Sequence, residues 1–227
     1  MPLEYVYIVF QIIAFLFAIS VHESAHAWMA NLRGDPTARM LGRITLNPIK
    51  HIDAVGSVLL PAIGLFSPAH TLFGWAKPTP VNPLRWRNKR VANFWVSAAG
   101  VICNFIIAVI AGVIIRVLYS VGIIGIVNGS LAPATTDSMI AVGAVDLLWG
   151  FFTLNVALGV FNLIPIPPLD GSKVLQSILP PSFEPGFEAL ERFGFLLLIV
   201  AMFTGVFRVI FSFVMPLAIT ILFLGAS

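Results

Sequence analysis

The chain has 227 residues, of which 59% are hydrophobic and only 10% are charged. Soluble domains carry about a quarter charged residues, so this composition excludes an ordinary soluble protein and indicates a chain that lies in a lipid bilayer. The net charge of +3 does not indicate a nucleic-acid partner, and a single cysteine excludes both a disulfide framework and a cysteine-rich metal site.

The first predicted helix runs from about Glu4 to about Asn31 and joins an apolar stretch to a charged motif. Tyr5–Ile19 is almost entirely apolar, and His22-Glu23-Ser24-Ala25-His26 follows it. On a helix, four-residue spacing puts both imidazoles on one face. H-E-x-x-H on a helix is typical of zinc hydrolases, in which the histidines bind the metal and the glutamate is the general base. Ionisable groups at the end of a membrane helix are costly, so they indicate a site.

The segment after this helix is predicted to be extended in two places. Polar and apolar residues alternate between Thr37 and Asn47, which predicts a strand or short hairpin. A second extended piece is expected at Trp75–Asn82, where closely spaced prolines forbid a helix. Between them, Ala54–Phe66 is apolar but short, so we expect it to re-enter the membrane or lie partly buried.

The remaining apolar stretches predict further helices. They are Val91–Val121, Met139–Ile164 and a C-terminal pair at about 187–224, with a loop at Gly122–Asp137. The fold class predicted is an all-α polytopic membrane protein, with about five to six transmembrane or partly inserted helices and short membrane-associated β-strands after the first helix. We expect a single integral-membrane domain over residues 1–227, with its core at about 4–180.

The basic residues predict an orientation. Nine of the thirteen Lys and Arg residues lie in the loops Arg33–Asp53 and Lys77–Arg90. The positive-inside rule places these loops in the cytoplasm and the N-terminus outside. The helix at Met139–Ile164 then returns inward and brings Asp170 to the same half of the membrane as the two histidines. We therefore expect a multi-pass protein of the cell membrane whose active site opens toward the cytoplasm.

A zinc hydrolase needs a third protein ligand beside the two histidines. By residue type, the candidates are Asp170, Asp53, His51, His70, Asp146 and Cys103. Asp170 is favoured because it follows Pro165-Ile166-Pro167-Pro168, where we expect non-helical backbone. Irregular backbone at membrane depth is tolerated only where it is buried in protein or lines a wet cavity.

Two motifs together resemble the site-2 protease family of intramembrane zinc metalloproteases. That family pairs H-E-x-x-H with N-x-x-P-x-P-x-L-D-G, which matches His22–His26 and Asn162–Gly171. Leu41–Pro48 and Gly74–Asn82 resemble compact prokaryotic members, and Gly100 with Asn104 matches the family's G-x-x-x-N element. The resemblance covers about Ser20–Gly171, and we expect a compact member without a PDZ or CBS domain.

The resemblance implies an intramembrane zinc metalloendopeptidase with one Zn²⁺ per chain. Its metal ligands would be His22, His26 and Asp170, with Glu23 as the general base and Asn162 polarising the scissile carbonyl. Its substrates would be membrane proteins, cut within or near a transmembrane helix in regulated intramembrane proteolysis. Further candidate substrate-binding residues are Gly100, Asn104, Arg43 and Thr45.

Other interpretations remain open for the metal ligands and for the asparagines. A membrane zinc-binding or transport protein could use the same ligands, although the sequence contains no second acidic or histidine pair for an exit path. Four histidines are too few for a membrane di-iron oxygenase. Asn162 could be a helix C-cap and Asn155 an interhelical hydrogen-bond partner, while Gly100 and Asn104 could serve close packing.

Overall fold

The computed structural model describes residues 3–66, 74–127, 130–135 and 138–225, so the candidate ligand His70 lies outside it. The described chain is a mostly helical membrane protein. Its four helices that are long and apolar enough to cross a membrane are Tyr7–Leu32, Lys89–Ser120, Met139–Leu163 and Val206–Phe223. The helical class is thus confirmed, while five to six inserted helices stays a prediction.

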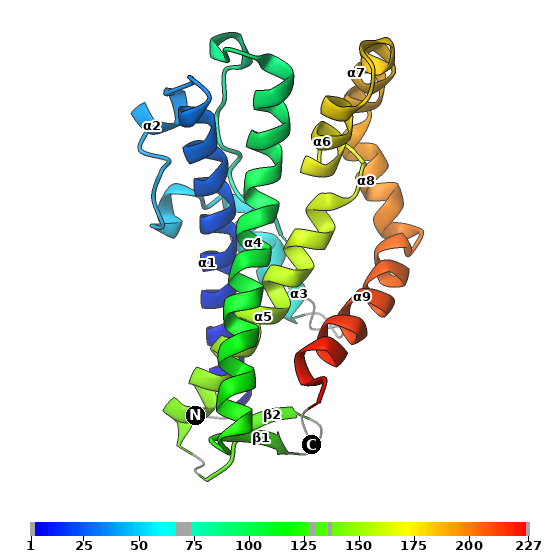
Figure 1. Cartoon of the computed structure of the whole chain (residues 1–227). Coiled ribbons are helices and arrows are strands. Elements are labelled where there is room, and N and C mark those ends of the chain that lie inside the picture. The colour runs from blue at the N-terminus through cyan, green and yellow to red at the C-terminus, as the bar shows by residue number, and fades with distance from the viewer. Residues whose placement is uncertain (1–2, 67–73, 128–129, 136–137, 226–227) are drawn as a thin grey trace.

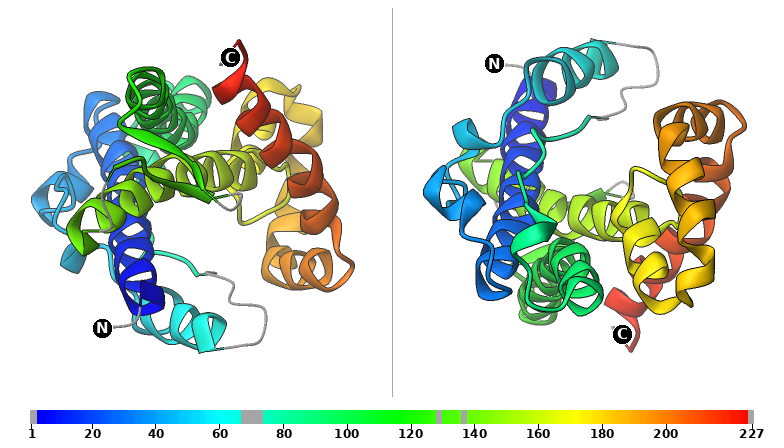
Figure 2. Two further views of the ribbon diagram at one scale, coloured as in Figure 1. Left: turned by 90° about the horizontal axis from the view of Figure 1, so that it is seen from below. Right: turned by 90° about the horizontal axis from the view of Figure 1, so that it is seen from above.

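Three long helices form the centre of the molecule. They are α1 (Leu3–Leu32), α4 (Lys89–Ser120) and α5 (Met139–Leu163), and each packs against the other two (Figures 1 and 2). Their bounds lie within a few residues of the predicted ones, because long apolar runs bounded by glycine and proline are strong local signals. Close packing on α4 is achieved by small buried residues, which include Ala98, Ala99, Gly100, Ala108, Ala111 and Gly112.

The prediction of a strand between Thr37 and Asn47 is wrong. Thr37–Met40 forms a short helix, α2, and Pro48–Lys50 forms a 3₁₀ turn, η1. Asp35 Oδ1 accepts hydrogen bonds from the amide and hydroxyl of Thr37, at 3.0 and 2.5 Å. Gly42 follows α2 with a φ of 66°. Local turns satisfy the backbone here, so the alternating pattern needs no partner strand.

The segment Trp75–Asn82 is extended, as predicted, but it joins no sheet among the described residues. Two of its amide groups bond instead to the residues that precede it in the chain. Trp75 N donates to Gly56 O at 3.1 Å, and Lys77 N donates to His51 O at 2.8 Å. Before it lie a π-helix, η2 (Ala54–Leu59), and α3 (Leu60–Phe66), whose combined length is short for a membrane crossing.

The two-stranded sheet found in the described chain lies where a loop was predicted. Strand β1 (Ile124–Val127) pairs antiparallel with β2 (Ser130–Pro133), with Ile124 opposite Pro133. The hairpin follows α4, at the end of the molecule where both ends of the described chain lie (Figure 1). The prediction therefore placed the strands on the wrong side of α4, since β-branched residues at Ile124–Val127 carried the stronger strand signal.

The C-terminal part is a series of short helices followed by one long helix. After α6 (Asp170–Ile178) come η4 (Pro181–Phe183), α7 (Glu184–Arg192), α8 (Gly194–Phe203) and α9 (Val206–Phe223). Helices α8 and α9 run one after the other toward the end that holds the hairpin (Figure 1). They join at Gly205, which has a φ of 78°. The predicted pair at about 187–224 is thus three successive helices, because the first predicted helix is divided into α7 and α8.

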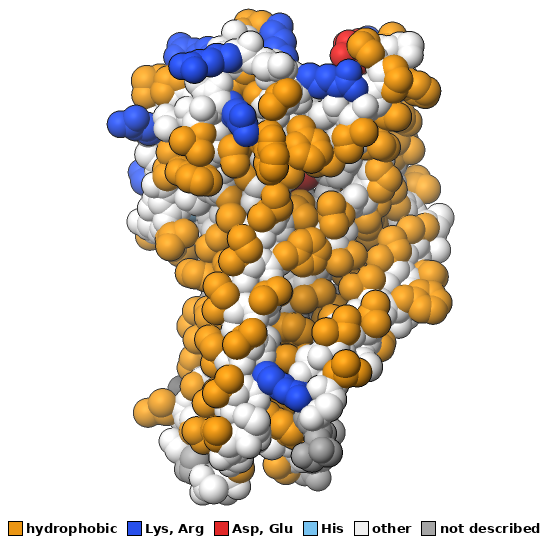
Figure 3. All heavy atoms as spheres, viewed as in Figure 1, with side chains coloured by type: hydrophobic (Ala, Val, Ile, Leu, Met, Phe, Trp, Pro, Cys, Tyr) orange, Lys and Arg blue, Asp and Glu red, His pale blue; other side chains and the backbone are white. Residues whose placement is uncertain are grey.

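Basic side chains gather at one end of the molecule. In Figure 3, most Lys and Arg atoms on the visible face lie at the end opposite the hairpin, and apolar side chains cover the long sides between the ends. The turn η3 (Pro83–Arg85) and the start of α4 belong to this basic end. An apolar belt below a basic end is the surface expected of a protein in a bilayer.

Candidate metal centre

Three buried side chains from α1 and α6 meet at one point. His22 Nε2 and His26 Nε2 each lie 3.1 Å from Asp170 Oδ2, and the two Nε2 atoms lie 3.0 Å apart. The exposed fractions are 8% for both histidines and 9% for the aspartate. Among the described residues, these three form a group close enough to share one metal ion.

The donor set fits a zinc ion. His26 Nδ1 lies 2.6 Å from the carbonyl oxygen of Val96, which can only accept, so in the neutral ring Nδ1 carries the proton and Nε2 presents a lone pair. Asp170 Oδ2 is buried without a hydrogen-bond donor. Tetrahedral zinc bonds of about 2.0–2.1 Å place neighbouring ligand atoms about 3.3 Å apart, close to the separations found. Lone pairs that face one another at this distance repel unless a cation lies among them.

The backbone of residues 164–169 is non-helical, as predicted for the proline-rich stretch, but Asp170 itself is not in irregular backbone, because it is the first residue of α6. Helix α6 begins directly against the end of α5, and a Cβ at Gly171 would collide with the carbonyl of Leu163. At its other end, the Arg90 guanidinium donates to the carbonyls of Ser177 (2.6 Å), Ile178 (2.7 Å) and Leu179. Helix α4 therefore holds α6, a role of Arg90 that no motif indicated.

Gly100 of α4 lies directly against the two imidazoles. A Cβ at this position would lie 2.6 Å from His26 Nε2 and 2.7 Å from His22 Cε1. Any larger residue would have to displace at least one ring, since real Cβ atoms essentially never approach this closely. The described contacts of Gly100 are therefore with the metal centre, and its substrate-binding role stays a prediction.

Asn104 and Asn155 lie behind His22 and are completely buried. Asn104 Oδ1 lies 2.5 Å from His22 Nδ1, and Asn104 Nδ2 donates to Asn155 Oδ1 at 2.7 Å. The interhelical hydrogen bond predicted for Asn155 is confirmed. Asn104, predicted to contact substrate, contacts a ligand histidine.

Glu23 is held by the extended segment. Thr79 N donates to Glu23 Oε2 at 2.8 Å, and the Thr79 hydroxyl donates to the Glu23 carbonyl at 2.9 Å. The buried Arg43 guanidinium holds the same segment through the carbonyls of Lys77 and, at 3.2 Å, Pro78. Thr79 was missed by sequence reasoning, because an isolated threonine between prolines carries no signal of a contact to α1.

The loop beside this segment contains two more of the candidate residues. Thr45 Oγ1 accepts from Asn47 N at 3.2 Å, and the Thr45 carbonyl lies 2.8 Å from His51 Nε2. Burial, together with the charge of Arg43, lowers the pKa of His51 below its ordinary value, so the ring is neutral. Asp53 Oδ1 caps η2 by accepting from Val55 N at 3.0 Å. Neither His51 nor Asp53 joins the group of ligands.

A cavity of about 360 Å³ opens beside the three ligands. Asn162, near the end of α5, lies on its wall and donates to the Leu158 carbonyl at 3.0 Å. Across the cavity, the rings of Trp75 and Phe195 lie 6.3 Å apart at nearly a right angle. The polar and charged side chains that line the cavity are His22, Glu23, His26, Ser97, Thr79, Asn162, Asp170 and Lys173. The predicted catalytic and metal-binding residues therefore share one cavity.

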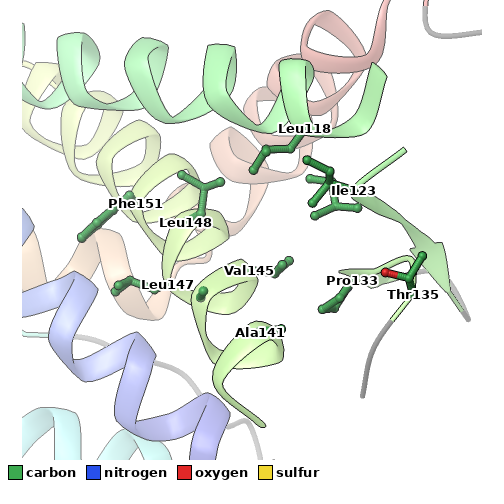
Figure 4. Close-up of a pocket in the computed structure, with 11 residues that line it drawn as sticks. Leu118, Ile123, Pro133, Thr135, Ala141, Val145, Leu147, Leu148 and Phe151 are labelled. Carbon is green, nitrogen blue, oxygen red and sulfur yellow. The ribbon is translucent and has the colours of Figure 1, made fainter. Parts of the chain in front are cut away.

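A larger cavity, of about 450 Å³, lies elsewhere, and none of the described residues that line it is ionisable (Figure 4). It is formed by the end of α4, the hairpin and the start of α5, and Leu118, Ile123, Pro133 and Phe151 line it. Among the described residues, the wall of this cavity is apolar apart from the hydroxyl of Thr135, whereas the metal-ligating and acid–base side chains lie in the cavity beside Asp170.

Comparison with known proteins gives consistent matches. The model of peptidase family M50 matches residues 10–201. The chain is 34% identical over 193 residues to "Putative zinc metalloprotease YwhC" of Bacillus subtilis (strain 168), covering 85% of this chain and 80% of the relative. It is 29% identical over 204 residues to "Putative zinc metalloprotease Rip2" of Mycolicibacterium smegmatis, covering 89% and 70%. No solved structure matches significantly.

These matches and the geometry of the site lead to the same family. The family model spans most of the chain, including both histidines and Asp170, and the similarity to the Bacillus subtilis protein covers at least four fifths of each chain. The chain belongs to peptidase family M50, the site-2 protease family, and is an intramembrane zinc metalloprotease.

Proposed function

We propose that His22, His26 and Asp170 are the zinc ligands, that Glu23 is the general base, and that the enzyme cuts other membrane proteins within or near their transmembrane helices. The observation that carries this proposal is the convergence of three buried ligand atoms, 3.0–3.1 Å apart, in a cavity that also contains Glu23 and Asn162. The family acts on membrane-protein substrates in a bilayer. Cleavage within or near a transmembrane helix is proposed because the cavity lies among the membrane helices.

Each side chain has a distinct task in this proposal. Zinc held by the three ligands would supply Lewis-acid chemistry, which acidifies water and polarises a peptide carbonyl. Glu23 takes the proton of the attacking water and passes it to the leaving amine. Thr79 N–H holds Glu23 Oε2, which leaves Oε1 for the proton transfer. The side-chain NH₂ group of Asn162 donates one hydrogen to Leu158 O, and its other hydrogen can be donated to the carbonyl oxygen of the substrate.

Substrate alignment is assigned to the extended segment Trp75–Asn82. A transmembrane helix hides its carbonyl groups in i→i−4 hydrogen bonds, so a substrate must unwind before attack. The amides of Trp75, Lys77 and Thr79 bond inward, to Gly56, His51 and Glu23. Because alternate residues of an extended chain point their amides to opposite sides, Ala76 presents the other edge to an unwound substrate.

The orientation proposed puts the basic end in the cytoplasm and the N-terminus outside, in the cell membrane. The support is the concentration of Lys and Arg in the loops at that end, to which the positive-inside rule applies. The metal centre lies on the last turns of α1 and the first residue of α6, so it would open toward the cytoplasm.

Replacement of Glu23 separates this proposal from a zinc transporter with the same ligands. Glu23→Gln keeps the size of the side chain but cannot accept a proton. In liposomes with a test substrate that has one transmembrane helix, we expect it to keep about one zinc per chain and to lose about 10²–10⁴-fold in cleavage rate. A transporter needs no general base and would be unaffected.

Two controls accompany this measurement. Glu184→Gln makes the same chemical change at an exposed carboxylate on α7 and should cleave at the wild-type rate. The metal chelator 1,10-phenanthroline should abolish wild-type cleavage, and added zinc should restore it. Cleavage by Glu23→Gln at the wild-type rate would refute the role of Glu23 as the base.

A further inference from the structure

Two asparagines lie completely buried between helices of the membrane core, Asn104 on α4 and Asn155 on α5. A buried amide in apolar surroundings destabilises the fold unless its donors and acceptors are paired. The bonds of these two amides form one chain, which begins at a backbone carbonyl of α5 and ends at His22. Neither the H-E-x-x-H motif nor the motif around Asp170 includes Asn155.

The direction of each bond in this chain follows from its first member. The carbonyl oxygen of Phe151 can only accept, so Asn155 must turn its NH₂ group toward it, at 2.8 Å. Asn155 Oδ1 therefore faces Asn104, which must donate to it through Nδ2, at 2.7 Å. Asn104 Oδ1 then faces His22. The orientation of both amides is thus determined by an acceptor that cannot reverse its role.

This direction fixes the tautomer of His22. Asn104 Oδ1 lies 2.5 Å from His22 Nδ1 and can only accept, so Nδ1 carries the ring proton. The lone pair of Nε2 then points toward Asp170 Oδ2, 3.1 Å away, which is the arrangement that a metal ligand needs. The opposite tautomer would place a proton on Nε2, where the metal must bind.

The two ligand histidines are held in the tautomer with the proton on Nδ1 by different hydrogen-bond partners. His26 Nδ1 faces the backbone carbonyl of Val96, which cannot turn around. His22 faces a side-chain amide, whose oxygen and NH₂ ends are nearly equal in size and can exchange places by rotation. The other bond that opposes this rotation at Asn104 is a long one, 3.4 Å, to the carbonyl of Ala18. Asn155 therefore supplies the main restraint on Asn104.

We propose that Asn155 is a positioning residue of the metal centre, which acts through Asn104 to hold His22 in the tautomer that binds zinc. The inference rests on the metal centre proposed above and extends it to a residue that is separated from the ligand His22 by two hydrogen bonds. Its readout is zinc affinity, so it is tested independently of proteolysis.

The test measures the zinc dissociation constant by competition with a chelator, in detergent, for wild type, Asn155→Leu, Asn104→Leu and the double variant. Loss of an outer hydrogen-bond partner of a metal-binding histidine typically weakens metal binding about 10–100-fold, and we expect losses in this range for both single variants. Because Asn155 acts only through Asn104, the double variant should bind zinc no more weakly than Asn104→Leu alone.

Three further variants separate positioning from packing. Thr153→Val removes a side-chain bond to the carbonyl four residues earlier on the same helix, 2.9 Å to Trp149, and should keep wild-type affinity. Asn155→Ser can still bond to Phe151 but is too short to reach Asn104, so it should weaken zinc binding as Asn155→Leu does, even if the leucine variant fails to fold. Asn155→Asp, whose carboxyl is neutral in apolar surroundings, can donate to Phe151 and accept from Asn104, and should stay within a few-fold of wild type.

Two results would overturn the inference while leaving the metal centre intact. One is wild-type zinc affinity in a folded Asn155→Leu or Asn155→Ser protein. The other is a double variant in which the two single losses multiply, because that would show two independent effects. Wild-type protein that binds no zinc would instead contradict the metal centre itself, and the inference with it.

Discussion

The core of α1, α4 and α5 and the C-terminal helices α7–α9 are built in different ways. In the core, small side chains such as Ala108 allow the helices to approach one another closely. Ala108 is 3% exposed, and the larger Ile115 is 0% exposed. In the C-terminal part, large apolar side chains face outward, with Phe203 89% and Phe213 73% exposed. Helices α7–α9 lie at the periphery of the core (Figure 2).

The hydrogen bonds differ in the same way. Buried amides and imidazoles join α1, α4 and α5 to one another, whereas α9 packs on the core through apolar side chains and receives one hydrogen bond, from Arg116 Nη1 of α4 to the Leu222 carbonyl. Between membrane helices there is no strong hydrophobic driving force, so small residues and hydrogen bonds must hold an exact geometry. The core therefore sets the positions of the ligands, and the C-terminal helices contribute apolar wall, such as Phe195 and Leu198, to the cavity.

The largest expected effect comes from a methyl group in the core. Gly100→Ala would place a Cβ 2.6–2.8 Å from atoms of both ligand imidazoles, so at least one ring must move. We expect zinc affinity to fall by about 100-fold or more and cleavage to approach background, because metal sites depend on the placement of every ligand. Zinc content after dialysis and cleavage in liposomes measure the two losses.

The same substitution in the C-terminal helices provides the control. A methyl group at Gly186 of α7 would meet no atom within 4 Å, and the backbone there is not left-handed, so Gly186→Ala should leave zinc content and activity within about 2-fold of wild type. Equal effects of the two substitutions would contradict the distinction between core and periphery.

A smaller effect is expected from the loop that connects the core to the extended segment. Arg43→Met removes the donors that hold the carbonyls of Lys77 and Pro78, and with them the restraint on Thr79 and Glu23. We expect kcat/KM to fall by about 10–100-fold with zinc content unchanged, since a displacement of about 1 Å at a catalytic group has this order of effect. Arg39→Met, at an exposed position of α2, should change neither quantity. Loss of zinc in Arg43→Met would assign the arginine to the metal centre instead.

The smallest expected effect concerns the outward surface of α9. Phe213→Ala should change the free energy of unfolding in detergent by less than about 0.5 kcal/mol, because the ring packs against little of the protein. Phe152 is 6% exposed and packs against Gly112 in the core. Phe152→Ala should therefore lower the free energy of unfolding by roughly 2 kcal/mol or more. Similar losses for the two phenylalanines would mean that α9 is as tightly packed as the core.

The sequence by itself determined the membrane class, three long helices, the family and a set of ligand candidates that meet in the structure. Apolar runs and the H-E-x-x-H spacing are local patterns, because the rise and turn of a helix are set by the backbone alone. The match of two distant motifs to a known family then joined Asp170 to the histidines, which lie almost 150 residues earlier in the chain.

Only the tertiary structure decided how the ligands are supported and where the strands lie. In the segment Thr37–Asn47 the backbone forms turns near Asp35 and no strand. Asp170 begins the helix α6, whose other end is held by Arg90 of α4. Gly100 and Asn104 were candidates for substrate contact, yet they lie against the imidazoles. Such roles depend on which side chains of separate helices face one another, and the periodicity of one helix contains no information about its neighbours.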